Sequence, residues 1–236
     1  MSEWPNVKLA DVADIRFSNV DKKSTPGELA VRLCNYMDVY GNGGYVTADR
    51  AYMDASASHA EVERFGIEKG DVIITKDSET PDDIGIPAVV LDDIPKLVCG
   101  YHLALIRPNR KAIHPIYLAM QLATKTTATY YSRLANGSTR YGLSSSAIAS
   151  TRIPLAPLLQ QRRIAEILST VDEAIEQTEA LIEKLRQVKA GLMHDLFTRG
   201  VTPDGHLRPR ATRPRTSTRN PRLGGYRRSG KGFCLG

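Results

Sequence analysis

The chain has 236 residues, of which 42% are hydrophobic and 25% charged, and its formal net charge at pH 7 is +6. This length accommodates one ordinary domain with extensions, and the apolar content is ample for a core. Neither a signal-peptide pattern nor an apolar run long enough to span a membrane is found, so a secreted or membrane-embedded protein is not expected. Cys34, Cys99 and Cys234 are odd in number and far apart. They predict a reducing, cytoplasmic setting and no structural zinc.

The positive charge is unevenly distributed along the chain. Residues 198–236 contain ten Arg or Lys and a single acid, Asp204, whereas the remaining residues contain 22 basic and 25 acidic side chains. A protein that reads DNA sequence usually presents a basic face. In this chain such a face has to come from local clustering, because the total charge of residues 1–197 does not supply it.

The first third of the chain predicts short strands and turns. Residues 7–17 have mixed periodicity, compatible with a strand followed by a helical turn. Residues 29–35 alternate like a strand, with Val31 and Leu33 on one face and Arg32 on the other. The glycine-rich stretch 41–44 is a turn signal.

The middle of the chain continues this mixed pattern. Residues 58–65 predict a short helix, and residues 72–75 (Val-Ile-Ile-Thr) a buried strand. A polar loop, 76–83, precedes another apolar strand at 86–91. A further strand at 97–106 is interrupted at Gly100-Tyr101-His102.

The pattern then changes to helix. Residues 115–134 carry a helical apolar stripe, and Asn136-Gly137 ends it before a loop at 138–141. Residues 148–155 predict a last strand, and Pro154 with Pro157 closes the domain. We therefore predict an α+β fold: one domain over residues 1–157, a long helix over 158–197, and a disordered basic tail over 198–236.

The long helix pattern has a seven-residue apolar repeat. One row is Ile164, Val171, Thr178, Leu185 and Leu192; the second is Ile167, Ala174, Leu181 and Val188; and a third is Leu168, Ile175 and Ile182. Such a repeat favours a supercoiled partner helix, and the pattern at 160–197 would reach roughly 55 Å at ~1.5 Å per residue. No second helix of this length is predicted, so the partner is expected in another chain. The alternative is a long core helix of one globular domain.

Signals of catalysis are missing from the sequence. It contains no glycine-rich phosphate loop and no GxSxG, and its five histidines lack metal-ligand spacing. The Asn/Asp-Pro-Pro-aromatic run of adenine methyltransferases and the acid-any-Lys pattern of nucleases are also not found. The acidic residues of the 76–83 loop fit a solvated loop better than a metal site. We expect no catalytic residue and no bound metal.

Three segments carry groups suited to nucleic acid. Lysine and hydroxyl side chains donate to phosphates, an arginine fork reads guanine, and a glutamate accepts from the cytosine amino group. The predicted DNA-binding residues are Lys76, Ser78, Glu79, Thr80, Tyr101, His102, Ser138, Thr139, Arg140 and Tyr141. For each one alone the alternative of a merely solvated polar loop stays open.

A family resemblance links these segments. The run Gln-Gln-Arg-Arg-Ile-Ala-Glu-Ile-Leu-Ser-Thr-Val-Asp at 160–172 resembles the conserved helix of specificity subunits of type I restriction-modification enzymes. The resemblance continues through 179–182 and 191–196, and residues 76–80 and 137–144 resemble parts of the family's target recognition domain. It covers nearly all of residues 4–209.

This resemblance implies a function. In that family two recognition domains are each followed by a long helix, the helices pack antiparallel, and each domain reads half of a split site in double-stranded DNA. Methyltransferase subunits dock around them and the restriction subunit joins through these, so S-adenosylmethionine, ATP and Mg would be bound only by the partners. With one domain and one helix, this chain resembles a half-subunit.

A half-subunit is expected to self-associate through its helix. The helix residues assigned to the partner contact are Ile164, Ile167, Val171, Ile175, Leu181, Leu185, Val188 and Leu192. The alternative to DNA recognition is a coiled-coil assembly or adaptor protein without direct DNA contact.

The tail carries its own hypothesis. Residues 205–209 still resemble the family's linker to a second recognition domain, but 210–236 are Arg-rich without apolar periodicity, which predicts disorder. With permitted synonymous codons, a shifted reading of 213–231 gives Ala-Pro-Asp-Leu-Tyr-Lys-Glu-Ser-Pro-Leu-Gly-Trp-Ile-Pro-Glu-Glu-Trp-Glu, which resembles the entry into that domain. We expect an out-of-frame remnant, which the nucleotide sequence from Leu207 onward would test. The alternative is a basic arm with weak, salt-sensitive attraction to DNA.

Overall fold

The structure is a computed structural model that describes residues 4–41 and 43–209. By internal contacts the chain divides into two compact units, Met1–Gln177 and Thr178–Gly236. The predicted disordered tail began at residue 198, but the structure describes residues 198–209, which contain the end of a helix and a turn. The rest of that prediction, residues 210–236, lies outside the described residues. No helix within the described ranges is both long and apolar enough to cross a membrane.

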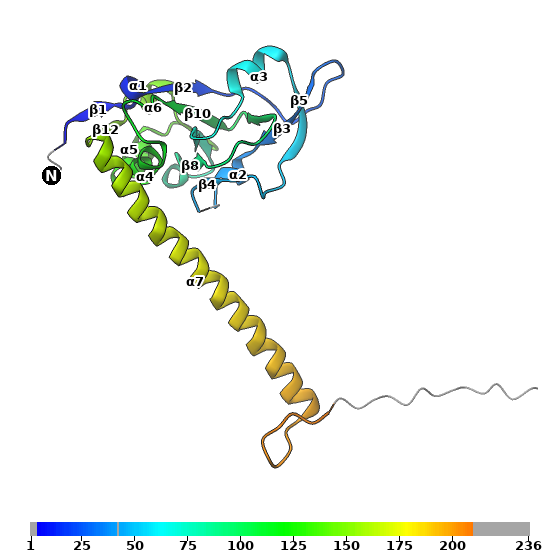
Figure 1. Cartoon of the computed structure of the whole chain (residues 1–236). Helices are drawn as coiled ribbons and strands as arrows, with labels where there is room; N and C mark the ends of the chain where they lie inside the picture. The colour runs from blue at the N-terminus through cyan, green and yellow to red at the C-terminus, as the bar shows by residue number, and fades with distance from the viewer. Residues whose placement is uncertain (1–3, 42, 210–236) are drawn as a thin grey trace, which may run out of the picture. The chain divides into compact units, whose positions relative to one another are not determined.

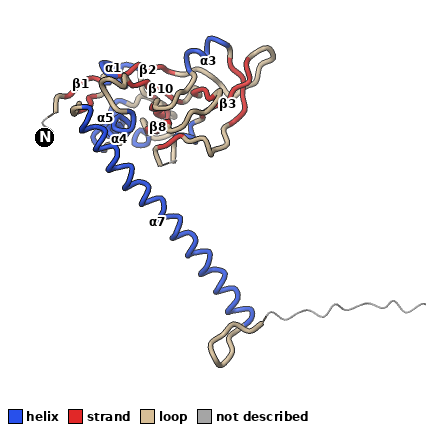
Figure 2. The backbone as a smooth tube through the Cα atoms, viewed as in Figure 1, coloured by secondary structure: helices blue, strands red, loops and turns tan. Residues whose placement is uncertain are grey.

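A five-stranded sheet forms the centre of the first unit (Figures 1 and 2). Its strands in spatial order are β2 (Ala13–Phe17), β10 (Leu103–Pro108), β6 (Val72–Thr75), β8 (Pro87–Val90) and β4 (Tyr45–Val46). All neighbours are antiparallel except β4 and β8. Strand β6 confirms the buried strand predicted at 72–75, and β8 confirms the apolar strand predicted at 86–91. All four residues of each are buried.

Smaller sheets surround this centre. A three-stranded sheet contains β5 (Met53–Ala57), β3 (Leu29–Cys34) and β9 (Leu97–Cys99). Two short ladders join β1 (Asn6–Lys8) to β12 (Arg152–Pro154) and β7 (Asp77–Ser78) to β11 (Tyr141–Gly142). In β3, Val31 and Leu33 are buried and Arg32 is exposed, which confirms the predicted alternation.

Short helices fill the connections. They are α1 (Leu9–Val12), α2 (Tyr36–Val39), α3 (His59–Phe65), a 3₁₀ turn η1 (Pro81–Asp83), α4 (Pro115–Leu122), α5 (Lys125–Leu134) and α6 (Ser145–Ala149). Helix α3 confirms the predicted helix at 58–65, with Ser58 as its N-cap accepting from the Glu61 N–H.

Two predicted elements in this region are wrong in detail. The single helix expected at 115–134 is split, because Thr124 is not helical and its hydroxyl caps α5 by accepting from the Thr127 N–H at 3.4 Å. The strand expected at 148–155 is short, because α6 occupies its first residues and β12 keeps only Arg152–Pro154.

The alternation of side chains along the central strands creates two cores. Ile73 and Leu105 point to the face that packs against the three-stranded sheet, in one buried cluster. Their neighbours Val72, Ile74 and Ile106 point to the other face and pack with residues of α4, α5 and α6 in a second cluster. The domain is therefore built in three layers, with the five-stranded sheet in the middle.

Helix α7 (Leu158–Arg199) is the predicted long helix, and it has 42 residues. It begins beside α4 (Figure 1), where Gln161 and Ala165 are buried. The Tyr45 hydroxyl donates to the Asp172 carboxylate at 2.8 Å, which ties the first part of α7 to β4. Burial and this bond raise the pKa of Tyr45 to about 12. After Arg199, residues 200–209 form a turn closed by a bridge between Val201 and Leu207.

Candidate nucleic-acid interface

The ladder between β7 and β11 brings two of the three predicted DNA-binding segments together. Ser78 pairs with Tyr141, and Asp77 pairs with Gly142. The ladder is extended by the Leu143 N–H, which donates to the Lys76 carbonyl at 2.8 Å. Segments about sixty residues apart in sequence therefore form one surface.

The loop that carries Arg140 is closed at its base. Asn136 and Gly142 exchange two backbone hydrogen bonds of 3.1 and 2.9 Å, so residues 137–141 form a tight projection. Gly137 has φ +148°, and an added Cβ would meet the Arg140 carbonyl oxygen, so the turn requires glycine here. Ser138, Thr139 and Arg140 are all exposed at its tip.

The turn between β9 and β10 joins the same surface. The Lys76 N–H donates to the His102 carbonyl at 3.0 Å, and His102 Nδ1 lies 2.7 Å from an Asp77 carboxylate oxygen. That oxygen is also 3.4 Å from Lys76 Nζ. Tyr101 is exposed beside it, with its ring centroid 3.6 Å from that of His102. All three segments predicted from the sequence are thus adjacent.

The side chains differ in how accessible they are. Glu79, Thr80 and Arg140 are exposed, and Arg140 makes no salt bridge within the described part of the chain. Ser78 differs from expectation, because its side chain is inside: the residue is only 4% exposed and its hydroxyl accepts from the Thr80 N–H at 3.4 Å. Ser78 supports the loop instead of presenting a hydroxyl to a ligand.

Two tyrosines that were not predicted belong to this surface. Tyr36, the first residue of α2, and Tyr40, which follows the helix, stack with their ring centroids 5.3 Å apart. Burial raises the pKa of Tyr36, whose hydroxyl bonds to Ser78 and lies near Arg140 and Glu79. A hydrogen bond with Asp83 raises the pKa of Tyr40. The available signal was a pair of aromatics four residues apart, directly before the glycine-rich turn.

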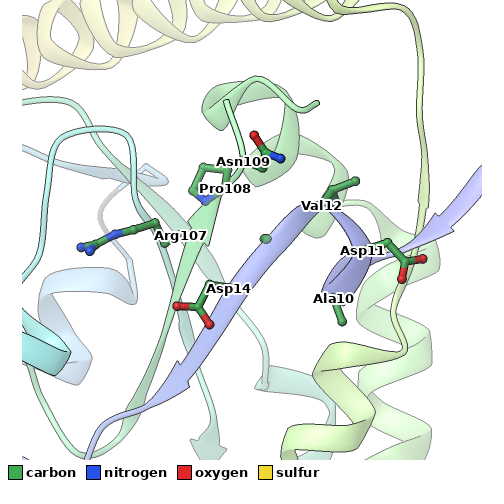
Figure 3. A pocket seen from close by; sticks show the side chains of 8 residues that line it. Ala10, Asp11, Val12, Asp14, Arg107, Pro108 and Asn109 are labelled. Carbon is green, nitrogen blue, oxygen red and sulfur yellow. The ribbon is translucent and has the colours of Figure 1, made fainter. Parts of the chain in front are cut away.

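A separate polar pocket of about 540 Å³ lies where α1 and β2 meet the end of β10 (Figure 3). Its charged side chains are partnered within the chain: Asp14 contacts Arg16 at 2.7 Å, and Arg107 contacts Asp71 at 2.8 Å. Asp11 accepts from the Lys8 N–H at 3.1 Å and points away from Arg107. This pocket holds no nucleophile beside a base, and no cluster of metal-ligating side chains is found within residues 4–41 and 43–209.

The apolar stripe of α7 is exposed over most of its length. Its predicted contact residues are between 49% (Val171) and 64% (Ile167) exposed, and the others are Ile175, Leu181, Leu185, Val188 and Leu192. Ile164 differs from the prediction that it contacts a partner helix. It is partly buried against the second core cluster of its own domain, the one formed with α4, α5 and α6. The exposed part of this stripe, called the seam below, therefore begins at Ile167.

The family model described as type I restriction modification DNA specificity domain matches residues 1–187. The chain belongs to this family. A putative type I restriction enzyme MjaX specificity subunit of Methanocaldococcus jannaschii is 30% identical over 142 residues, which are 60% of this chain and 33% of that protein. The MjaVIII specificity subunit of the same organism is 48% identical over 50 residues, 21% of this chain and 12% of that protein.

Solved structures show the same fold for this specificity domain. The S subunit of a type I system from M. genitalium has a TM-score of 0.52 at 18% identity, covering 83% of this chain and 46% of that one. The HsdS subunit from Thermoanaerobacter tengcongensis has a TM-score of 0.53 at 18% identity, covering 84% and 45%. This chain therefore spans about half the length of these structures. The likeness confirms the predicted α+β recognition domain followed by a long helix.

Proposed function

We propose that this chain is the sequence-specific DNA-recognition subunit of a type I restriction-modification system, which reads one half-site and docks the methyltransferase subunit. The observation that carries the proposal is the β7–β11 ladder, which gathers three polar segments into one surface. A loop that is only solvated does not require pairing with a second strand. A surface that contacts DNA bases does require its side chains to be fixed relative to each other.

The polar groups of this surface divide into two roles. Arg140 at the tip of its loop is the base-reading candidate, because a guanidinium fork matches the O6 and N7 atoms of guanine. Glu79 can accept from a cytosine amino group. Lys76 and the hydroxyls of Thr80 and Thr139 would hold phosphates and set the register. Tyr101, His102, Ser138 and Tyr141 complete the contact set, and Ser78 positions it.

The exposed seam of α7 supports self-association. Two copies packed antiparallel would pair the first heptad row of one helix with the second row of the other. One register pairs Ile167 with Leu192, Val171 with Val188, Ala174 with Leu185, and Thr178 with Leu181 across the two-fold axis. This register uses the exposed seam from Ile167 to Leu192. Ile164 takes no part in it and packs against its own domain. A two-fold pair reads the same half-site twice, so the target would be an interrupted palindrome.

Chemistry would belong to other subunits. We propose that this chain contributes no catalytic residue, that S-adenosylmethionine is bound by the methyltransferase subunit, and that ATP and Mg are bound by the restriction subunit. The complex would work in the cytoplasm, where its DNA substrate is.

The test is selection from a random library of DNA duplexes by the chain together with its methyltransferase subunit. One interrupted palindrome should be enriched. Arg140→Ala should relax one base position in each half, whereas Arg152→Ala, an exposed arginine in β12, should leave the selected sequence unchanged. If the complex forms but no sequence is enriched, DNA recognition is wrong, and the adaptor function favoured by the exposed α7 seam replaces it.

A further inference from the structure

A second pocket, of about 480 Å³, lies at the end of the central sheet opposite to the β7–β11 surface. Gly70 before β6, Leu91 after β8 and Arg110 after β10 line it, together with His114 before α4 and Arg162 in the first turns of α7. Strands β6 and β10 are antiparallel, so residues 70 and 110 lie at one end of the pair and residues 76 and 102 at the other. The pocket is therefore distinct from the proposed DNA surface.

The charge of this pocket is one-sided. Lys69, Arg110 and Arg162 line it, and all three are exposed. Within residues 4–41 and 43–209 none of them has a carboxylate partner; Arg110 is held by a hydrogen bond to the Lys69 carbonyl. The carboxylates next to Lys69 in sequence, Glu68 and Asp71, are both engaged by Arg107, at 3.0 and 2.8 Å. Asp92, which follows the lining residue Leu91, accepts from the Ala48 N–H at 2.9 Å. Three cations thus converge without neutralisation.

The pocket is also lined by a histidine with an unsatisfied ring nitrogen, and two helices begin beside it. His114 Nδ1 is buried and has no hydrogen-bond partner among the described residues. The His114 backbone is fixed, since its N–H donates to Gln161 Oε1 at 2.7 Å. Helices α4 and α7 both begin here, and helix N-termini carry partial positive charge that favours anions. Burial, and then the nearby Arg162, lower the pKa of His114.

We propose that this pocket binds the carboxylate of an acidic segment of a protein partner, which, given the proposed function, is the methyltransferase subunit. The remaining walls are apolar, from Val89, Val90, Leu91, Pro115, Ile116 and Leu158. They fit the methylene groups of a glutamate or an apolar neighbour, which a phosphate backbone does not offer. Because these apolar walls suit a protein side chain better than a phosphodiester backbone, a protein carboxylate is favoured over a DNA phosphate.

The experiment compares two charge-reversed forms of the full chain that change the net charge equally. Arg110→Glu with Arg162→Glu alters the pocket, whereas Lys111→Glu with Lys125→Glu alters exposed lysines outside its lining. Association with the purified methyltransferase subunit is measured by titration calorimetry at two salt concentrations. The pocket variant should bind at least tenfold more weakly than the control, and the difference should shrink at high salt.

A single Arg162→Gln variant guards against a folding defect, because the Arg162 side chain makes no salt bridge with the described residues. It should keep the unfolding midpoint of the unaltered chain and still lose part of the affinity. Equal association of the pocket and control variants would overturn this inference and leave the proposed function intact. So would a loss of DNA affinity with subunit association unchanged, since that outcome assigns the pocket to phosphate. If the unaltered chain does not bind the subunit at all, the docking part of the proposed function falls with it.

Discussion

Replacing Gln161 should detach the beginning of α7 from its domain. Gln161 is 0% exposed, and its side chain is fully bonded: Oε1 accepts from the His114 N–H at 2.7 Å, and Nε2 donates to the carbonyls of Ala112 and Ala156 at 3.1 and 2.7 Å. Methionine has a similar length and shape but makes none of these bonds. Gln161→Met therefore removes the partner of the buried Ala156 carbonyl and those of the partly buried His114 N–H and Ala112 carbonyl.

The magnitude follows from these three bonds. At about 1 kcal/mol net for each hydrogen bond, Gln161→Met should lower the free energy of unfolding by about 3 kcal/mol. For a protein of this size that corresponds to a fall in Tm of about 6–12 °C. Gln161→Glu should be worse at neutral pH, because a carboxylate would face the two carbonyl oxygens that Nε2 now serves.

Chemical denaturation followed by circular dichroism measures the difference. The matched control is Gln160→Met, since Gln160 is the adjacent residue and is exposed; its free energy of unfolding should change by less than about 0.5 kcal/mol. If Gln161→Met is as stable as Gln160→Met, the three bonds do not hold the helix to the domain and the reasoning is refuted.

Three further predictions concern the seam, the DNA surface and pH. Val171→Asp with Leu185→Asp should convert a dimer to monomers in light scattering, and an unchanged mass would contradict the seam. Arg140→Ala should weaken specific DNA binding by about 1–3 kcal/mol and relax one base position. Lys76→Ala should instead weaken binding to all sequences and reduce the salt dependence of the affinity. Fluorescence anisotropy measures both effects. Burial lowers the pKa of His114 in the folded protein. As pH falls below about 6.5, the imidazole is therefore protonated in the unfolded chain before it is protonated in the folded one. Its contribution to stability is present above that pH and is lost below it, so the unaltered protein should lose more stability between pH 7.5 and 5 than His114→Gln.

The sequence pattern predicted those strands and helices whose formation depends on residues close together in the chain. The continuous apolar run of β6, the alternation of β3 and the heptads of α7 are all readable from neighbouring residues. The split between α4 and α5 was missed because its cause is one capping hydroxyl at Thr124 inside a continuous apolar stripe. Ile164 was misassigned because a heptad does not say which of its positions the preceding domain covers.

The interface was harder to predict because its geometry is non-local. Sequence reasoning found the three segments but not their ladder, since pairing between Ser78 and Tyr141 depends on the path of the whole chain. Burial of the Ser78 side chain follows from that pairing and from Tyr36, so the residue type alone could not reveal it. Tyr36 and Tyr40 carry no motif of their own and belong to the surface only through the fold.

The ladder between β7 and β11 has a consequence for engineering new targets. The two segments share backbone hydrogen bonds, and the Lys76 carbonyl accepts from the Leu143 N–H, so they form one structural unit. If residues 76–80 alone were exchanged, the new strand would have to pair with the original residues 141–143, and the loop that carries Arg140 would be misaligned. Transplanting 76–80 together with 136–143 keeps the register, so altered specificities should be portable as a pair of loops and not as either loop by itself.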